Sequence, residues 1–157
     1  MKGKPLMRSM LTSAIVLAGL LGGCAGQMDL PKHFVAVRAD DLGDYHVRGI
    51  SADGVVVGLR SEDNPTGGTL EFWSDAVAGE LTGGRGYKLM ETESITARSG
   101  LDGRMLTLST TRSGGEFTYV LGVYIKGPKV LIAEAGGMAD AVEKHLPELR
   151  AAMLSVR

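Results

Sequence analysis

The sequence predicts an α+β fold in which an antiparallel β-sheet is flanked by helices. Three observations predict it: alternation of apolar and polar residues, two segments of helical periodicity, and glycine-rich turns between these segments. The clearest strand is 117–125, in which large apolar side chains occupy every second position. We therefore expect Leu121 to lie in the core and Thr118 on the opposite, more tolerant face of the strand.

The elements before this strand follow in order. Strands at 45–50 and 55–59 flank an Asp-Gly pair, which between alternating runs is a strong hairpin signal. A helix is predicted from Leu70 to Leu81, with Thr69 as its N-cap and two glycines at its end.

The remaining elements complete the order ββ-α-ββββ-α. Four strands are predicted at 87–98, 105–111, 117–125 and 130–135, and the last three form an antiparallel meander. Apolar residues then keep helical spacing from 138 to 156. Pro147 points away from this apolar stripe, so we expect it to bend the terminal helix or split it in two.

The N-terminus has the features of a leader. Lys2, Lys4 and Arg8 precede a charge-free apolar segment, 10–21, whose length fits the apolar region of a signal peptide. The segment is too short for a membrane span, which needs roughly 20 apolar residues. It ends in Leu-Gly-Gly-Cys at 21–24, and this cysteine is the only one in the chain.

The Leu-Gly-Gly-Cys stretch resembles the lipobox of bacterial lipoproteins. The resemblance implies cleavage between Gly23 and Cys24, a diacylglycerol on the Cys24 sulfur and usually a third acyl chain, such as palmitate, on its amine. Two or three acyl chains give stable anchoring where one would be marginal. An ordinary secretory signal with an incidental cysteine is the alternative.

Domain boundaries follow from this interpretation. We expect a signal peptide at 1–23, an acylated N-terminus and tether at 24–33, and one α+β domain at 34–157. The tether would span on the order of 25 Å when extended and keep the domain near its own membrane. Ala25 follows the cysteine, where an aspartate would resemble an inner-membrane retention signal, so we expect the outer membrane, facing the periplasm.

Charge and cysteine content exclude several classes of protein. The chain has 17 Lys and Arg residues against 18 Asp and Glu; three basic residues lie in the leader, so 14 remain and the mature charge is −4. A basic surface for nucleic acid is therefore not expected. One cysteine excludes intramolecular disulfides and cysteine-rich zinc sites.

The element order, Gly86-Tyr87 after the first helix, the long strand around Tyr119, and Glu-Ala-Gly-Gly at 134–137 before the last helix resemble the PsbP-like superfamily. This group includes a photosystem subunit, a Ran-binding import factor and bacterial DcrB-type envelope lipoproteins. The resemblance implies an α-β-α sandwich and non-catalytic roles in binding or assembly. It carries no shared active site onto this chain, and fold alone does not define function.

Candidate site residues are few. Glu134 should share a sheet face with its apolar neighbours, and Glu80 falls inside the apolar helical arc that includes Trp73. Buried carboxylates need partners or a raised pKa, and such positions are enriched at functional sites. The alternative is that Glu134 caps the last helix and Glu80 leans into water. The three histidines lack the spacing of a metal pair, so no metal or cofactor is expected.

The sequence therefore predicts a membrane-anchored envelope lipoprotein, not an enzyme, whose domain binds or assembles with another envelope component. One alternative is a carrier that holds a small apolar ligand between sheet and helix, which a lined apolar cavity would favour. The other is an enzyme of unrecognised type. A cleft that gathers Glu80 or Glu134 with a histidine would favour the enzyme.

Overall fold

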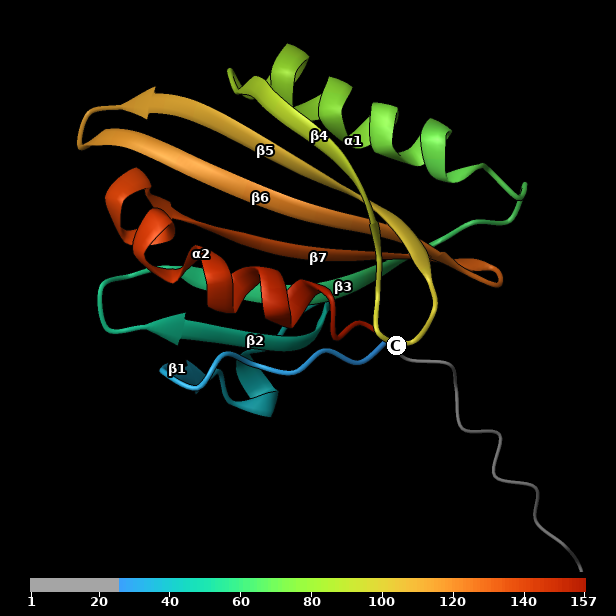
Figure 1. Cartoon of the computed structure of the whole chain (residues 1–157), viewed down its shortest axis with the longest axis horizontal. Helices are drawn as coiled ribbons and strands as arrows, with labels where there is room; N and C mark the ends of the chain where they lie inside the picture. The colour runs from blue at the N-terminus through green and yellow to red at the C-terminus, as the bar shows by residue number, and fades with distance from the viewer. Residues whose placement is uncertain (1–25) are drawn as a thin grey trace, which may run out of the picture.

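The computed structural model describes residues 26–157, which form a seven-stranded antiparallel sheet and two α-helices (Figure 1). The elements are β1 (Phe34–Ala36), the short 3-10 helix η1 (Ala39–Asp41), β2 (Tyr45–Ser51), β3 (Val56–Asp63), α1 (Leu70–Gly84), β4 (Lys88–Thr96), β5 (Asp102–Arg112), β6 (Gly115–Lys126), β7 (Lys129–Met138) and α2 (Ala139–Met153). The predicted α+β class and element order are confirmed, and β1 and η1 are additions.

The sheet has the strand order β1-β2-β3-β7-β6-β5-β4. Strands β5 to β7 form the predicted meander, which β4 extends to four strands, and β2 and β3 form the predicted hairpin around Asp53-Gly54. After β3 the chain crosses through α1, so β3 pairs with β7, the last strand. Glu134 on β7 is thereby placed between Gly58 of β3 and Leu121 of β6.

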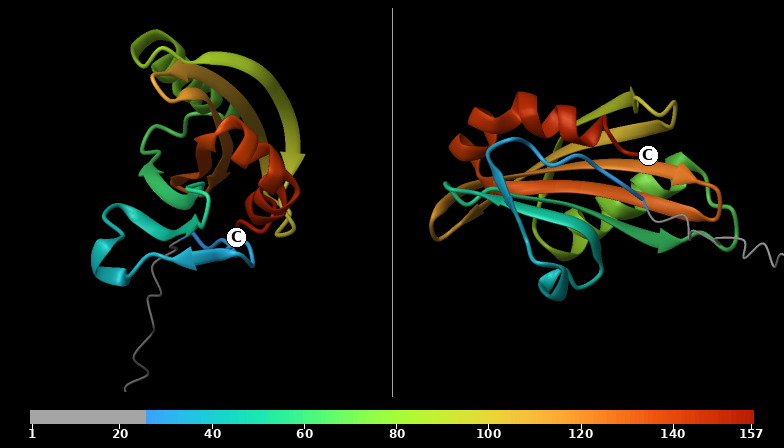
Figure 2. Two further views of the ribbon diagram at one scale, coloured as in Figure 1. Left: turned by 90° about the vertical axis from the view of Figure 1, so that its left-hand side faces the viewer. Right: turned by 90° about the horizontal axis from the view of Figure 1, so that it is seen from below.

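The two helices lie on opposite faces of the twisted sheet (Figure 2). Helix α1 packs on β4, β5 and β6, whereas α2 packs on β6 and β7. Leu121 is buried on the α1 face as expected, but Val120 and Tyr124 are equally buried beneath α2. The expectation of a tolerant second face is therefore wrong for the middle of β6, because a helix covers each side.

The helix ends follow local sequence. The Thr69 side chain accepts a hydrogen bond from the backbone N–H of Phe72 at 3.1 Å, as predicted for an N-cap, and α1 ends at Gly84. Of the two outcomes predicted for Pro147, a bend or a split, the split does not occur, because α2 continues through it. The N–H that Pro147 lacks would have bonded to the carbonyl of Glu143 on the exposed side, where water can replace it.

The segment 26–33, expected to be part of a free tether, instead packs against the domain. The backbones of Gln27 and Arg157 exchange two hydrogen bonds of 2.9 and 3.0 Å, beside the C-terminus (Figure 1). Met28 is buried in the core beneath α2, and the Asp29 N–H donates to the Ser155 hydroxyl at 2.8 Å. The tether prediction is corrected here, because burial of Met28 fixes the segment to the C-terminal residues.

Gly23 and Cys24 lie outside the described residues, so the lipobox stays a prediction. Within residues 26–157, no helix combines the length and apolar character that crossing a membrane requires.

Candidate binding groove

A groove lies on the α1 face of the sheet, next to the strands that α1 covers. Its volume is about 310 Å³, and it extends from β2 across β3, β7 and β6 to β5. Its lining combines aromatic rings and two arginines with Glu134 and several glycines; the aromatic and arginine residues are Tyr45, Arg48, Tyr87, Arg112, Phe117 and Tyr119. We call it the tyrosine groove.

Glu134 lies in the tyrosine groove and is only 8% exposed. The Tyr45 hydroxyl donates a hydrogen bond to its Oε1. Arg60 Nε lies 3.4 Å from its Oε2 and forms an ion pair with it. Both carboxylate oxygens therefore have partners, which offsets the cost of burying the charge.

Two glycines make room for the tyrosine rings beside Glu134. A Cβ atom at Gly58 would lie 2.7 Å from Cδ1 of Tyr45, and one at Gly136 would lie 2.8 Å from Cδ2 of Tyr119. Any side chain at either position would push the ring away. The glycines thus allow each ring to lie close to the sheet backbone, flanking the carboxylate.

Burial and the Glu134 carboxylate keep the neighbouring tyrosines protonated. Burial, followed by the hydrogen bond to Glu134, raises the pKa of Tyr45 to about 12. Burial, followed by the negative charge of Glu134, raises the pKa of Tyr119 well above its ordinary value. Burial lowers the pKa of Arg60, but the Glu134 and Glu62 carboxylates outweigh this and raise it. At neutral pH the hydroxyls are therefore hydrogen-bond donors and the guanidinium is charged.

The two arginines at the sides of the groove are held by aromatic rings. The Arg48 guanidinium lies 5.2 Å from the Tyr45 ring centroid. The Arg112 guanidinium lies 5.7 Å from the centroid of Tyr87 and 5.4 Å from that of Phe117. Among residues 26–157, neither arginine has a carboxylate within ion-pair distance.

Of the three predicted site residues, Glu134 is the one in the groove. It is buried on the face predicted for it, but it does not cap α2, whose N-cap Met138 forms no side-chain cap bond. Glu80 is exposed and pairs with Arg85 at 2.7 Å, as the alternative expected. Glu80 and Glu134 nevertheless line one adjoining polar hollow of about 430 Å³.

Trp73 is away from the tyrosine groove and makes a structural contact. Its Nε1 donates to Asn64 Oδ1 at 3.0 Å, and its ring packs with the core under α1. The Asn64 side chain also donates a hydrogen bond to the carbonyl oxygen of Gly68 and accepts one from its N–H. Trp73 therefore supports the connection between β3 and α1.

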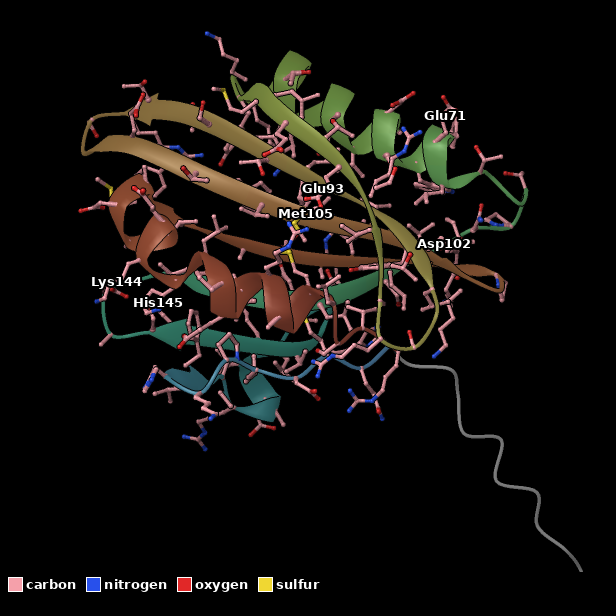
Figure 3. All side chains as sticks on the ribbon, in the orientation of Figure 1. Glu71, Glu93, Asp102, Met105, Lys144 and His145 are labelled. Carbon is pink, nitrogen blue, oxygen red and sulfur yellow. The ribbon has the colours of Figure 1, made fainter. Side chains whose placement is uncertain are left out.

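No histidine is among the described residues that line the groove. His145 instead lies on α2 beside the β2–β3 turn, with Nε2 2.9 Å from Asp53 Oδ1 and its ring edge-on to Phe34 (Figure 3). It is buried and hydrogen-bonded, as its place beside the apolar stripe predicts. In the described part of the chain, no three His, Asp or Glu residues gather as a metal site would require.

Sequence reasoning missed most of the groove. Arg48, Arg112 and Tyr45 were not candidates, since each lies on a strand with unremarkable alternation. One available signal was the glycine-and-tyrosine content of the strands, because glycine in a strand often marks a close approach of another group. The pairing of β3 with β7 was needed to bring these residues together.

No protein-family model matches the sequence, and no curated protein matches it. The fold does have similar solved structures. The solution structure of cyanobacterial PsbP (CyanoP) from Synechocystis sp. PCC 6803 matches with a TM-score of 0.60 and 13% identity, over 94% of this chain and 98% of that one.

A second similar structure is LpqN of Mycobacterium tuberculosis, described as involved in cell envelope biogenesis. The TM-score is 0.65 and the identity 13%, over 83% of this chain and 81% of LpqN. At this identity the likeness shows the fold alone. The protein therefore has a PsbP-like α+β fold, in agreement with the resemblance found in the sequence.

Proposed function

We propose that this protein is a lipid-anchored, non-catalytic binding module of the bacterial cell envelope, and that its partner binds in the tyrosine groove. The observation that carries the proposal is the groove itself. It combines a concave surface with aromatic sides and arginines whose charge no described carboxylate neutralises. Concave, aromatic-lined sites with a few placed polar groups are typical of ligand and partner recognition.

The envelope location and the anchor draw support from two sources. The Leu-Gly-Gly-Cys stretch at 21–24 resembles a lipobox, and the fold is similar to that of LpqN, a protein described as involved in cell envelope biogenesis. Ala25 favours the outer membrane, with the domain facing the periplasm. Acylation of Cys24 would make the membrane a permanent partner of the chain.

In this proposal, the packed N-terminal segment would hold the folded domain close to the membrane. Gly26 is the second residue after Cys24, so a chain reach of only about 7 Å would separate the acylated residue from the folded domain. Asp102 marks this end of the molecule, whereas His145 marks the other (Figure 3). The groove includes Gly54 and Gly137, near His145, and would therefore lie toward the end of the domain that is remote from the anchor.

The contacts of Glu134 support a binding role over catalysis. General acid or base work requires a carboxylate that can exchange a proton with a substrate. Both oxygens of Glu134 are instead engaged by Tyr45 and Arg60. The described groove residues also include no histidine, serine or cysteine to act as a base or nucleophile.

Complementation of a deletion strain tests the anchor and the groove separately. We would compare the wild-type chain with Cys24→Ser, with Arg112→Glu, and with Arg38→Glu as a matched charge reversal at an exposed position outside the groove. Labelled palmitate and membrane fractionation would report anchoring. We expect Cys24→Ser to lose the label and the membrane fraction, and both Cys24→Ser and Arg112→Glu to lose function.

Two results would overturn the proposal. Full rescue by unanchored Cys24→Ser at wild-type levels would favour a diffusible carrier or an enzyme. Full rescue by Arg112→Glu would show that the groove is not the binding surface. Arg38→Glu should rescue in full.

A further inference from the structure

We propose that the tyrosine groove binds a ring-bearing organic anion, such as a phosphorylated or carboxylated sugar. The inference rests on the proposed function, since it names the class of ligand for the same groove. A volume of about 310 Å³ suits a ligand of roughly one or two sugar rings, because ligand pockets begin near about 300 Å³.

The charge of the groove differs in sign from that of the domain. The described residues carry 14 basic and 18 acidic side chains, a net charge of −4. The charged side chains that line the groove, however, are Arg48, Arg112 and Glu134, so two positive charges stand against one negative charge. A positive groove on a negative domain selects for an anion.

The arginines over these rings are positioned to bind that anion. A guanidinium that lies over a ring face keeps most of its five N–H groups available to a ligand. Arg112 donates one of these N–H groups to the Tyr87 hydroxyl, with Nη2 3.1 Å from the oxygen. The remaining N–H groups of the guanidinium match phosphate or carboxylate, and contact with the rings reduces the side-chain entropy lost when the ligand binds.

The aromatic side of the groove suits a ring. The rings of Tyr87 and Tyr119 have centroids 5.7 Å apart and are tilted by 38°, and the Phe117 ring is close to the same Arg112 guanidinium that lies over Tyr87. These rings can pack against the flat, apolar face of a ligand ring. The Tyr45 hydroxyl, kept protonated by its raised pKa, is directed at Glu134 and stiffens the other side of the groove.

Calorimetric titration of the full chain in detergent tests the inference. The anionic probes are glucose 6-phosphate and glucuronic acid, and glucose and inorganic phosphate are the controls for the ring and the charge alone. We expect at least one anionic sugar to bind about tenfold more tightly than either control. We expect Arg112→Gln and Arg48→Gln each to weaken that binding by about tenfold or more, since a hydrogen bond to a charged group contributes roughly that much.

Three controls make the result specific. Arg38→Gln, at an exposed site outside the groove, should bind as wild type does. Arg112→Lys keeps the charge but loses the forked guanidinium, so it should bind with intermediate affinity. Thermal unfolding would show that each variant is folded, and salt should weaken the binding of the anionic sugars.

The outcome separates this inference from the proposed function. If neither anionic sugar bound better than glucose, or if inorganic phosphate bound equally well, the ring-bearing anion would be the wrong ligand class. Loss of rescue by Arg112→Glu in the deletion strain would still support the groove as the binding surface. Binding that was unchanged in both Arg→Gln variants would place the anion elsewhere and overturn the inference.

Discussion

Arg60 on β3 and Glu134 on β7 form an ion pair on one face of two neighbouring strands, with Nε 3.4 Å from Oε2, although 74 positions separate them. The crossover through α1 brings the two strands together. Tyr45 donates to the other carboxylate oxygen from β2. Strands β2 and β3 therefore supply the hydrogen-bonding partners of one buried carboxylate on β7, in the lining of the groove.

Loss of the Glu134 carboxylate should destabilise the domain. In Glu134→Ala, half-buried Arg60 loses its buried carboxylate partner and keeps only the exposed Glu62, and we expect a loss of about 2 kcal/mol. Urea unfolding would measure it. In a double-mutant cycle with Arg60→Ala, the two losses should not add, because both changes remove the same ion pair. Additive losses would show that the pair contributes nothing.

Alkaline titration should show the raised pKa of Tyr45. Its folded pKa of about 12 lies above the ordinary value of 10.0, so the stability it contributes is present below pH 10 and is lost as the pH rises through about 12. Absorbance of the phenolate at alkaline pH would follow the titration. In Tyr45→Phe, the step near pH 12 should be absent. A wild-type curve with every tyrosine titrating near pH 10 would contradict the buried hydrogen bond.

Leu121→Asp should abolish cooperative unfolding. Leu121 is 1% exposed in the core under α1, and an unpaired charge there would cost more than about 4 kcal/mol. The matched control is Thr111→Asp, near the exposed end of β5, which should unfold as wild type does. Circular dichroism melts would compare them. Similar melts for both variants would mean that β6 is placed incorrectly.

The N-terminal segment should behave as part of the fold. A flexible insert after Ala25 should leave thermal stability unchanged, because it precedes the packed residues. The same insert after Gln27 should lower stability, since it separates the Gln27–Arg157 pairing from Met28. Met28→Ala should cost about 2 kcal/mol as a buried large-to-small change. Equal stability of both inserts would show that the segment is a free tether after all.

Acid unfolding should depend on Asp53. Hydrogen bonds from Ser51, Lys144 and His145 hold its pKa below the ordinary value of 3.8. Its stabilising effect is therefore present above about pH 4 and is lost as the pH falls below that value. The stability difference between wild type and Asp53→Asn should shrink between pH 5 and pH 2, as urea unfolding at each pH would show. Asp75→Asn, at an exposed helix position, is the control and should show no such trend.

Elements that depend on neighbours in the sequence could be predicted. The hairpin at Asp53-Gly54, the Thr69 cap and the alternation of β6 are local features, and each is found where the sequence placed it. The burial of Glu134 was also predictable, because alternation assigns it to the face of Val130 and Ile132. Its partners were not, since nothing local connects β7 to β2 or β3.

The sequence by itself determined the α+β class, the order of the elements and the meander of the last four strands, because hydrophobic periodicity and turn residues act over a few positions. Only the tertiary structure decided that β3 pairs with β7, that the helices take opposite faces, and that 26–33 docks beside Arg157. Several apolar strands could satisfy each local pattern. The choice among them depends on burying both faces of one sheet at once, and that same choice gathers Arg48, Glu134 and Arg112 into a groove.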